Sequence, residues 1–484
     1  MDKQIRRFGV VVIALFLLLF LQLNHIQVLQ ASHLANAPGN ARTVTREFAH
    51  PRGVIEAADG TVLAKSVPSK DLYNYQRVYP HGTLYAGVTG YFSLIYGLDG
   101  AEKTYDQYLS GRNVPFTHLS DLLAPNQTRV DNVTLTVSPK LQQTAATALG
   151  HRIGAVVAID PATGAILAMY SYPPYDPNAL ASHDAATAMK AWKADNAGSQ
   201  PLLDRAYRSR YPPGSTFKVV TSAAVYDHKP QLATKSYPVE SAIHLPETTN
   251  LFHNYANESC GGMLPELLKV SCDTGFAEVG LDLGGQALAG EAKAFGFDQT
   301  PPLDLPAPAQ SAFPPVSSFA QNLPALAFSA IGQENVAATP LEMAMVAGAI
   351  ADQGKIMAPH VMAQVRDNQG NLVKSYRPHR WLQATSAATA SVVRRLMVGV
   401  VKGGTATGIA LPGITLAAKT GTAEIGPGTH NNDDWMIAFG PAGAGQTPSI
   451  AVAAVVPDQP PSTEGATVAG PIVKTMLAAA LGGK

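Results

Sequence analysis

The sequence has little charge, few aromatic side chains and no excess of either sign. Of its 484 residues, 14% are charged and 7% are aromatic. The 35 lysines and arginines equal the 35 aspartates and glutamates, so the formal net charge is zero. Proteins that bind nucleic acid usually present a basic field with aromatic or arginine side chains along it. Nucleic acid is therefore not an expected partner.

Cysteine is also scarce. Cys260 and Cys272 are the two cysteines, and they have neither metal-ligand spacing nor paired histidines nearby. They are compatible with a disulfide across a short loop, if this region lies outside the cytoplasm, or with two buried thiols. A glycine-rich phosphate loop and a His-Glu-x-x-His helix are absent as well. Neither a metal nor a cofactor is expected.

The N-terminus has a basic start followed by a long apolar run. Lys3, Arg6 and Arg7 precede the run at 8–23, which is just long enough to cross a bilayer. The basic residues place that end in the cytoplasm and the rest of the chain outside it. A cleaved signal peptide is the alternative, since residues 35–37 (Ala-Asn-Ala) have the small-residue pattern. The apolar run is longer than a usual signal core, which favours an uncleaved single-pass anchor in the cell membrane.

The chain is long enough for two or three domains, and its patterns divide it into three segments. Residues 1–31 are the predicted cytoplasmic tail and transmembrane anchor. Residues 32–150 have strand-like runs at 53–55 and 61–63 between turn signals, without an arrangement of nucleophiles or paired carboxylates. We expect a small, loop-rich pedestal or dimerisation-like domain there. Residues 151–484 carry the candidate chemistry.

Strand and helix signals occur in separate blocks in the third segment. Two apolar runs joined by turn-forming residues predict an antiparallel hairpin, helices dominate the middle, and strands return near the C-terminus. Strands at both ends with helices between them predict an α+β fold, in which helices flank a central antiparallel sheet. The hairpin is predicted at 154–160 and 165–169, the helical block at 216–350, later strands at 416–419, 434–439 and 449–456, and a closing helix at 468–481.

One stretch places a serine and a lysine three residues apart at the start of a helix. Pro212 and Pro213 cannot continue an upstream helix, and the run 217–225 predicts a buried helix with Ser215 in its first turn and Lys218 on the same face. A desolvated lysine can lose its proton and activate a serine hydroxyl. The helix N-terminus also favours a developing oxyanion. Ser-x-x-Lys alone fits a surface lysine near a helix start equally well.

Two further motifs follow in order, Ser271-Cys272-Asp273 and Lys419-Thr420-Gly421-Thr422. With the first, they resemble the penicillin-recognising serine acyltransferases, which are penicillin-binding proteins and serine β-lactamases. The chain is similar to monofunctional class B penicillin-binding proteins, and the likeness covers most of it after residue 50. The chain lacks the glycosyltransferase region of class A members, and its first module is short. In both respects it is similar to the compact transpeptidases that act in cell division or in elongation, the process that maintains cell shape. The segments that carry this likeness are 52–55, 60–64, 160–169, 175–178, 205–206, 331–333, 339–344 and 403–406.

The resemblance implies an acyl-enzyme reaction in peptidoglycan biosynthesis. Ser215 would attack the penultimate D-Ala carbonyl of a stem peptide and release the terminal D-Ala, while Lys218 takes the serine proton. Ser271 would relay a proton towards the leaving amine, and Lys419 would keep the local field positive. An amine of a neighbouring stem peptide then completes the cross-link. β-Lactam antibiotics would mimic the donor and stop at the acyl-enzyme.

The same resemblance implies the substrate-binding groups. Backbone N–H groups of Ser215 and Thr422 would form the oxyanion hole. The hydroxyls of Thr420 and Thr422 would hold the substrate carboxylate, and Gly421 would let this strand approach the serine, since a Cβ would crowd it. In the alternative, Thr420 is an ordinary strand hydroxyl and Ser271 is a helix cap.

Asp273 stands where much of the group has asparagine. A carboxylate only accepts hydrogen bonds, whereas an amide also donates to the substrate. Asp273 could contact the substrate, or it could pair with Lys218 or Lys419. Such a pair would help to keep a lysine charged, in conflict with Lys218 as a neutral base. Asp434 and Trp435 are expected to support the sheet.

The main functional prediction is a membrane-anchored D,D-transpeptidase, a serine-type acyltransferase. One alternative is a hydrolase of the same fold, either a D,D-carboxypeptidase or a β-lactamase. The other is a catalytically silent cell-wall scaffold. By resemblance, the expected partners are peptidoglycan stem peptides ending in D-Ala-D-Ala, β-lactams, the membrane and a polytopic glycan polymerase.

Overall fold

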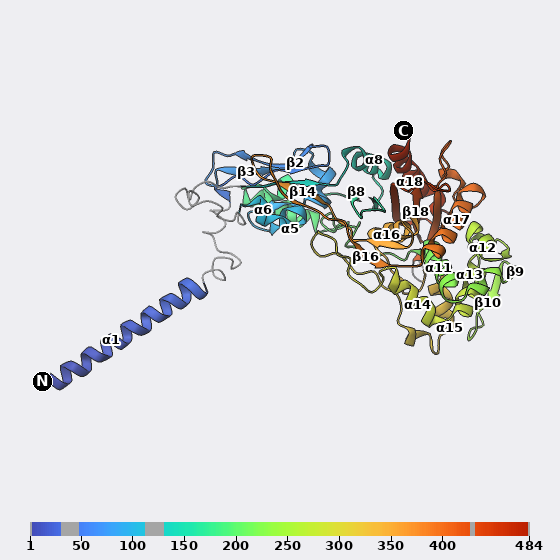
Figure 1. Ribbon diagram of the computed structural model, residues 1–484, viewed down its shortest axis with the longest axis horizontal. Coiled ribbons are helices and arrows are strands. Elements are labelled where there is room, and N and C mark those ends of the chain that lie inside the picture. Colours follow the sequence, from blue (N-terminus) through green and yellow to red (C-terminus); the bar gives the residue numbers. More distant parts are fainter. Residues whose placement is uncertain (1, 31–47, 112–129, 426–430, 483–484) are drawn as a thin grey trace.

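The computed structural model describes residues 2–30, 48–111, 130–425 and 431–482. The small-residue pattern at 35–37 lies outside these ranges. Within them the strands β2, β3 and β14 gather at one end of the body, and the helices α11 to α18 gather at the other (Figure 1). The two ends correspond to two separate sheets.

The N-terminal segment is helical and exposed. Helix α1 (Asp2–Asn24) continues into a π-helical turn, η1 (His25–Leu29). The stretch Lys3–Val28 is long and apolar enough to cross a membrane, and it is the one such helix in the described parts of the chain. This helix suggests a membrane anchor, as the apolar run in the sequence predicts.

A six-stranded sheet forms the core of the first end, in the order β15-β14-β6-β1-β2-β3. The runs predicted at 53–55 and 61–63 overlap the starts of β1 and β2, which pair antiparallel. Beneath them, Glu102 accepts hydrogen bonds from the buried guanidinium groups of Arg52 and Arg77. The strands are β1 (Ile55–Glu56), β2 (Val62–Pro68), β3 (Tyr75–Val78), β6 (Asn132–Leu135), β14 (Met362–Arg366) and β15 (Leu372–Ser375). Short helices η2 (Gly82–Tyr85), α4 (Ala86–Thr89), α5 (Gly100–Thr104) and α6 (Asp106–Leu109), with a small hairpin of β4 (Phe92–Ser93) and β5 (Gly97–Leu98), complete this end.

Two strands of this sheet come from much later in the sequence. β6 pairs in parallel with β1 along one of its edges. β14 pairs antiparallel with the other edge of β6. β15 then pairs with β14. In Figure 1, β14 in orange lies among the blue strands β2 and β3. The predicted domains at 32–150 and 151–484 therefore share a sheet.

A five-stranded sheet, in the order β17-β18-β19-β7-β8, forms the core of the second end. Every neighbouring pair is antiparallel, so the predicted hairpin, the returning C-terminal strands and the α+β class are confirmed. β17 lies at the edge of this sheet and thus keeps one side free of strand partners. The strands are β7 (Gly154–Ile159), β8 (Ile166–Tyr172), β17 (Ala417–Ile425), β18 (Asn431–Gly440) and β19 (Ile450–Gln459).

Helices bury nearly all of β18 and β19, in line with the apolar runs at 435–439 and 450–456. α16 packs on β7, β18 and β19, and α18 packs on β18, β19 and α8. The α-helices that follow β6 in the chain include these three. They are α8 (Pro139–Leu149), α9 (Pro177–Leu180), α10 (Ala185–Asp195), α11 (Lys218–His228), α12 (Leu264–Val270), α13 (Asp273–Leu283), α14 (Gly285–Ala294), α15 (Leu323–Ala330), α16 (Pro340–Ala351), α17 (Ala387–Gly403) and α18 (Gly465–Leu481).

Short strands interrupt the block predicted to be helical. β9 (Tyr237–Glu240) pairs with β12 (Cys260–Gly262), and β10 (Ala242–His244) pairs with β11 (Leu251–His253). Strands of three or four residues are too short for a two-residue alternation to be recognised. A further pair, β13 (Lys355–Met357) and β16 (Arg380–Gln383), follows α16. The two cysteines form a disulfide, which resolves the alternative left by the sequence.

Candidate active site

Ser215 lies in a tight turn that leads into α11. The turn is a 3-10 helix, η3 (Gly214–Phe217), so the serine precedes the α-helix by one turn instead of lying inside it. Gly214 has a φ of +50°, and its N–H donates to the carbonyl of Gly332 at 2.9 Å. The indole N–H of Trp435 donates to the carbonyl of Pro212 at 2.9 Å. The sheet and a distant loop thus hold the half-buried Ser215 in place.

Lys218 brings the first two motifs together. Its side chain is fully buried, and Nζ donates to Asp273 Oδ1 at 2.6 Å and to the carbonyl of Ser271 at 2.7 Å. The Ser271 hydroxyl lies 3.5 Å from the same Nζ. Ser215 Oγ donates to Asp273 Oδ1 at 3.5 Å. Ser215 and Lys218 therefore meet at one carboxylate oxygen.

Ser271 has a left-handed backbone between α12 and α13. Its φ of 63° and ψ of 35° end α12 and direct its side chain towards the third motif. Lys419 Nζ donates to Ser271 Oγ at 2.7 Å. Non-glycine residues in this conformation cost about 1–3 kcal/mol and concentrate at functional sites. The next residue, Cys272, is buried and bonded to Cys260, so a covalent link fixes the segment between the two site residues Ser271 and Asp273.

The edge strand β17 supplies the third motif. Lys419 is buried, and its Nζ also donates to the carbonyl of Thr420 at 2.9 Å. A Cβ on Gly421 would lie 2.8 Å from the carbonyl oxygen of Pro213 and 2.9 Å from Cγ2 of Thr216. The strand therefore runs directly against η3, and any side chain at residue 421 would separate them.

The hydroxyls of Thr420 and Thr422 extend from the face of β17 that is opposite to Lys419 and Gly421. Thr420 Oγ1 lies 2.7 Å from Thr405 Oγ1, just after α17. Thr422 Oγ1 accepts a hydrogen bond of 3.1 Å from the N–H of Gly465, the first residue of α18. Thr405 lies in a segment that carries the family resemblance, which implies no role for it, and nothing in the sequence indicates Gly465. No pattern along the chain pairs either residue with β17.

Burial dominates the electrostatics of both lysines. It lowers the pKa of Lys218, and the neighbouring Asp273 carboxylate opposes this shift. The pKa of Lys419 is well below the usual lysine value because of burial and, next, the charge of Lys218, with Asp273 again opposing. This direction works against the expected positive charge on Lys419. A carboxylate bound nearby would favour that charge.

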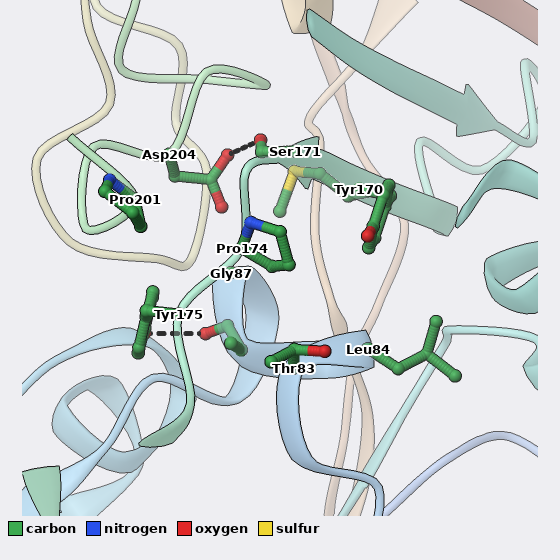
Figure 2. Close-up of a pocket in the computed structure, with 11 residues that line it drawn as sticks. Thr83, Leu84, Gly87, Tyr170, Ser171, Pro174, Tyr175, Pro201 and Asp204 are labelled. Carbon is green, nitrogen blue, oxygen red and sulfur yellow. Dashed lines mark hydrogen bonds between the residues drawn. The ribbon is translucent and has the colours of Figure 1, made fainter. Parts of the chain in front are cut away.

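A small pocket lies away from these residues, at the junction of the two ends (Figure 2). Ser171 donates to the buried carboxylate of Asp204 at 2.7 Å, and Tyr175 donates to the carbonyl of Ala86 at 2.8 Å. The first bond ties β8 to the loop that contains Asp204, and the second ties the segment after β8 to α4. The pocket includes none of the three motifs, and it is lined by Thr83, Leu84, Ala86, Gly87, Met169, Tyr170, Ser171, Pro174, Tyr175, Pro201 and Asp204.

Comparison with known proteins identifies the family. Residues 154–478 match the penicillin binding protein transpeptidase domain, and residues 52–133 match the penicillin binding protein A dimerisation domain. The chain belongs to the penicillin-binding protein transpeptidase family. The predicted family and fold are therefore confirmed. Within this family, the peptidoglycan D,D-transpeptidase PbpA of Mycolicibacterium smegmatis is 38% identical over 99% of both chains.

A further relative and a solved structure come from Mycobacterium tuberculosis. Its peptidoglycan D,D-transpeptidase PbpA is 37% identical over the full length of both chains. The structure of its penicillin-binding protein A, a ceftriaxone acyl-enzyme complex, has a TM-score of 0.83 at 36% identity and covers 90% of this chain and 100% of that one. This penicillin-binding protein thus shares its fold with a protein that a β-lactam acylates.

Proposed function

We propose that this penicillin-binding protein is a membrane-anchored peptidoglycan D,D-transpeptidase that acts through an acyl-enzyme on Ser215. The main support for the proposal is that side chains of the three motifs lie within hydrogen-bond distance of one another. Lys218 Nζ lies 2.6 Å from Asp273, and Lys419 Nζ lies 2.7 Å from Ser271 Oγ. Such an arrangement provides a nucleophile, a proton acceptor and a proton relay around one point.

In the first step, Ser215 Oγ bonds to the penultimate D-Ala carbonyl carbon while its proton moves to Lys218. Burial supports this role because it disfavours the charged amine. The backbone N–H groups of Ser215 and Thr422 stabilise the oxyanion. The C–N bond to the terminal D-Ala then breaks, and Ser271, whose hydroxyl lies 3.5 Å from Lys218 Nζ and is bonded to Lys419, relays the proton from Lys218 to the leaving amine.

The hydroxyls of Thr420 and Thr422 hold the terminal carboxylate of the donor peptide. Their orientation is supported by Thr405 and by the N–H of Gly465. The free edge of β17 pairs with the extended peptide backbone. An acceptor amine from a second stem peptide then attacks the acyl carbon, and Ser215 recovers its proton. β-Lactams, which carry a carboxylate and a strained amide, acylate the same serine.

The helix α1 is the single-pass anchor, with the catalytic domain on the extracytoplasmic side. The basic residues Lys3, Arg6 and Arg7 at its N-terminal end support this orientation. Residues 32–150 serve as the pedestal and residues 151–484 as the transpeptidase domain, joined by the shared strands β14 and β15. A polytopic glycan polymerase is the proposed partner in the membrane, by resemblance to other class B enzymes.

The test is labelling of the full-length protein in membranes with a fluorescent penicillin, followed by mass mapping of the modified peptide. A stable adduct is expected on Ser215, none in Ser215→Ala, and an unchanged adduct in the matched control Ser209→Ala. With a D-Ala-D-Ala donor and an acceptor amine, the same protein forms the cross-linked product. Rapid loss of the penicillin adduct with release of hydrolysed drug would indicate a hydrolase instead, and an adduct on another residue would refute the proposed nucleophile.

A further inference from the structure

Asp434 lies beside the proposed carboxylate-binding end of the site. It is on β18, directly opposite Thr422 on β17. Opposite residues of an antiparallel pair extend from the same face, with Cβ atoms about 4.5–5.5 Å apart. Asp434 therefore shares a face with Thr422 and Thr420, whereas Lys419 and Gly421 extend from the other face.

The Asp434 carboxyl is buried without a good partner. Its exposed fraction is 0%, and within the part of the chain that the structure describes neither oxygen makes a hydrogen bond of good geometry. A buried carboxylate without partners is costly, so the neutral form is favoured. Burial raises the pKa of Asp434 to about 6, the Glu464 carboxylate adds to the rise, and the Thr463 side chain opposes it.

The segment 463–465 covers Asp434 and is firmly attached. Asn432 donates to the carbonyl of Thr463 at 3.1 Å, and Tyr255 donates to the same carbonyl at 3.4 Å. The titratable groups around Asp434 are Glu464 ahead of α18, Tyr255 of η5 (Tyr255–Asn257) and the exposed Glu424 on the same face of β17. Asp433, which is bonded to Asp458 of β19, and Lys419 extend from the opposite face. The groups on its own side are thus all acids.

Thr422 has a single proton to donate. Its oxygen already accepts from the Gly465 N–H, so its own O–H is left for one acceptor. An ionised Asp434 would compete for that proton and would repel a second carboxylate. A protonated Asp434 does neither, and leaves the Thr422 hydroxyl to the ligand.

Building on the proposed function, we propose that Asp434 is a positioning and specificity residue whose carboxyl must be protonated when Thr422 holds a ligand carboxylate. Binding of an anionic donor then takes up one proton wherever Asp434 would otherwise be ionised. Asp433, its neighbour, extends from the other face and accepts a backbone bond from Asp458 at 3.0 Å. It provides a matched control, because burial raises its pKa to about 7 as well.

The experiment measures the second-order rate of acylation by penicillin G against pH, using the full chain in detergent. The variants are Asp434→Asn, which is always neutral, and Asp433→Asn. The acylation rate of Asp434→Asn divided by that of wild type should be near unity below pH ~5. This rate ratio should reach about tenfold near pH ~7, where only about one wild-type Asp434 in ten would be protonated. The ratio for Asp433→Asn should not change with pH. Because Lys218 and Lys419 titrate in every variant, their contribution cancels in the ratio.

Penicillin G methyl ester, which lacks the carboxylate, is the second arm. With the ester, the ratio of Asp434→Asn to wild type should stay near unity at every pH. A flat ratio for penicillin G, or an equal change with the ester, would overturn the role of Asp434. Should Asp434→Asn fold poorly, Asp434→Ala must show the same dependence on pH. A lack of any Ser215 adduct in all variants would instead refute the proposed function.

Discussion

Lys218 Nζ lies 2.6 Å from Asp273 Oδ1, and this lysine side chain is fully buried. The amine proposed as the base therefore has a carboxylate as its direct partner. Asp273 favours the charged amine, whereas burial favours the neutral one, and the balance lowers the pKa of Lys218. Ser215 donates to the same Oδ1 atom, so a change at Asp273 affects both groups.

The first prediction concerns Asp273→Asn. Removal of the carboxylate charge removes the influence that raises the pKa of Lys218, so this pKa should fall further. Acylation needs the neutral amine, which exists above its pKa. In a plot of acylation rate against pH, the acidic limb should therefore move to lower pH by about 1–2 units. Asp282→Asn, which breaks the more exposed pair with Lys235, is the control and should leave the limb unchanged. An upward shift or no shift in Asp273→Asn would contradict the pairing.

The second prediction concerns the contact between β17 and η3. Gly421→Ala places a Cβ 2.8 Å from the Pro213 carbonyl oxygen, so the edge strand must move away from Ser215. Acylation by penicillin should slow by about 10- to 100-fold, in line with the usual cost of overpacking. Gly399→Ala in α17 has nothing within 4 Å of the new Cβ and should retain the wild-type rate. Equal rates in the two variants would show that close approach at Gly421 is unnecessary.

The third prediction concerns Thr405, whose hydroxyl lies 2.7 Å from that of Thr420. Thr405→Val keeps the shape and removes the bond, which is worth about 1 kcal/mol. The acylation rate should fall about three- to tenfold, and the loss should appear in the initial affinity for penicillin, because Thr420 is proposed to bind its carboxylate. The nearby exposed Thr407→Val should behave like wild type. A loss confined to the chemical step would refute a binding role.

The fourth prediction concerns the disulfide between Cys260 and Cys272, which are 12 residues apart. Closing so short a loop stabilises the folded chain by about 3 kcal/mol through chain entropy. The double variant Cys260→Ser, Cys272→Ser should therefore unfold at a lower urea concentration. Wild-type protein treated with a reductant should show the same decrease, and the reductant should not affect the double variant. A double variant as stable as the oxidised protein would show that the bond contributes nothing.

The local features of this protein follow from short-range patterns in its sequence. The turn at Pro212 and Pro213, the helix after it and the spacing of Ser215 from Lys218 depend on residues within two helical turns. The hairpin of β7 and β8 is predicted by two apolar runs with a turn between them. The order of the three motifs indicated the family, and the comparisons confirm it.

Contacts between distant segments depend on the tertiary structure. Lys419 and Ser271 are 148 residues apart, and Met362 of β14 pairs with Leu135 of β6, which lies 227 residues earlier in the chain. The partner of Asp273, the disulfide, the Thr405 hydroxyl and the burial of Asp434 all arise when helices and strands pack. Composition and periodicity report only on neighbours along the chain, whereas charge and hydrogen bonding in the site depend on which segments exclude water together.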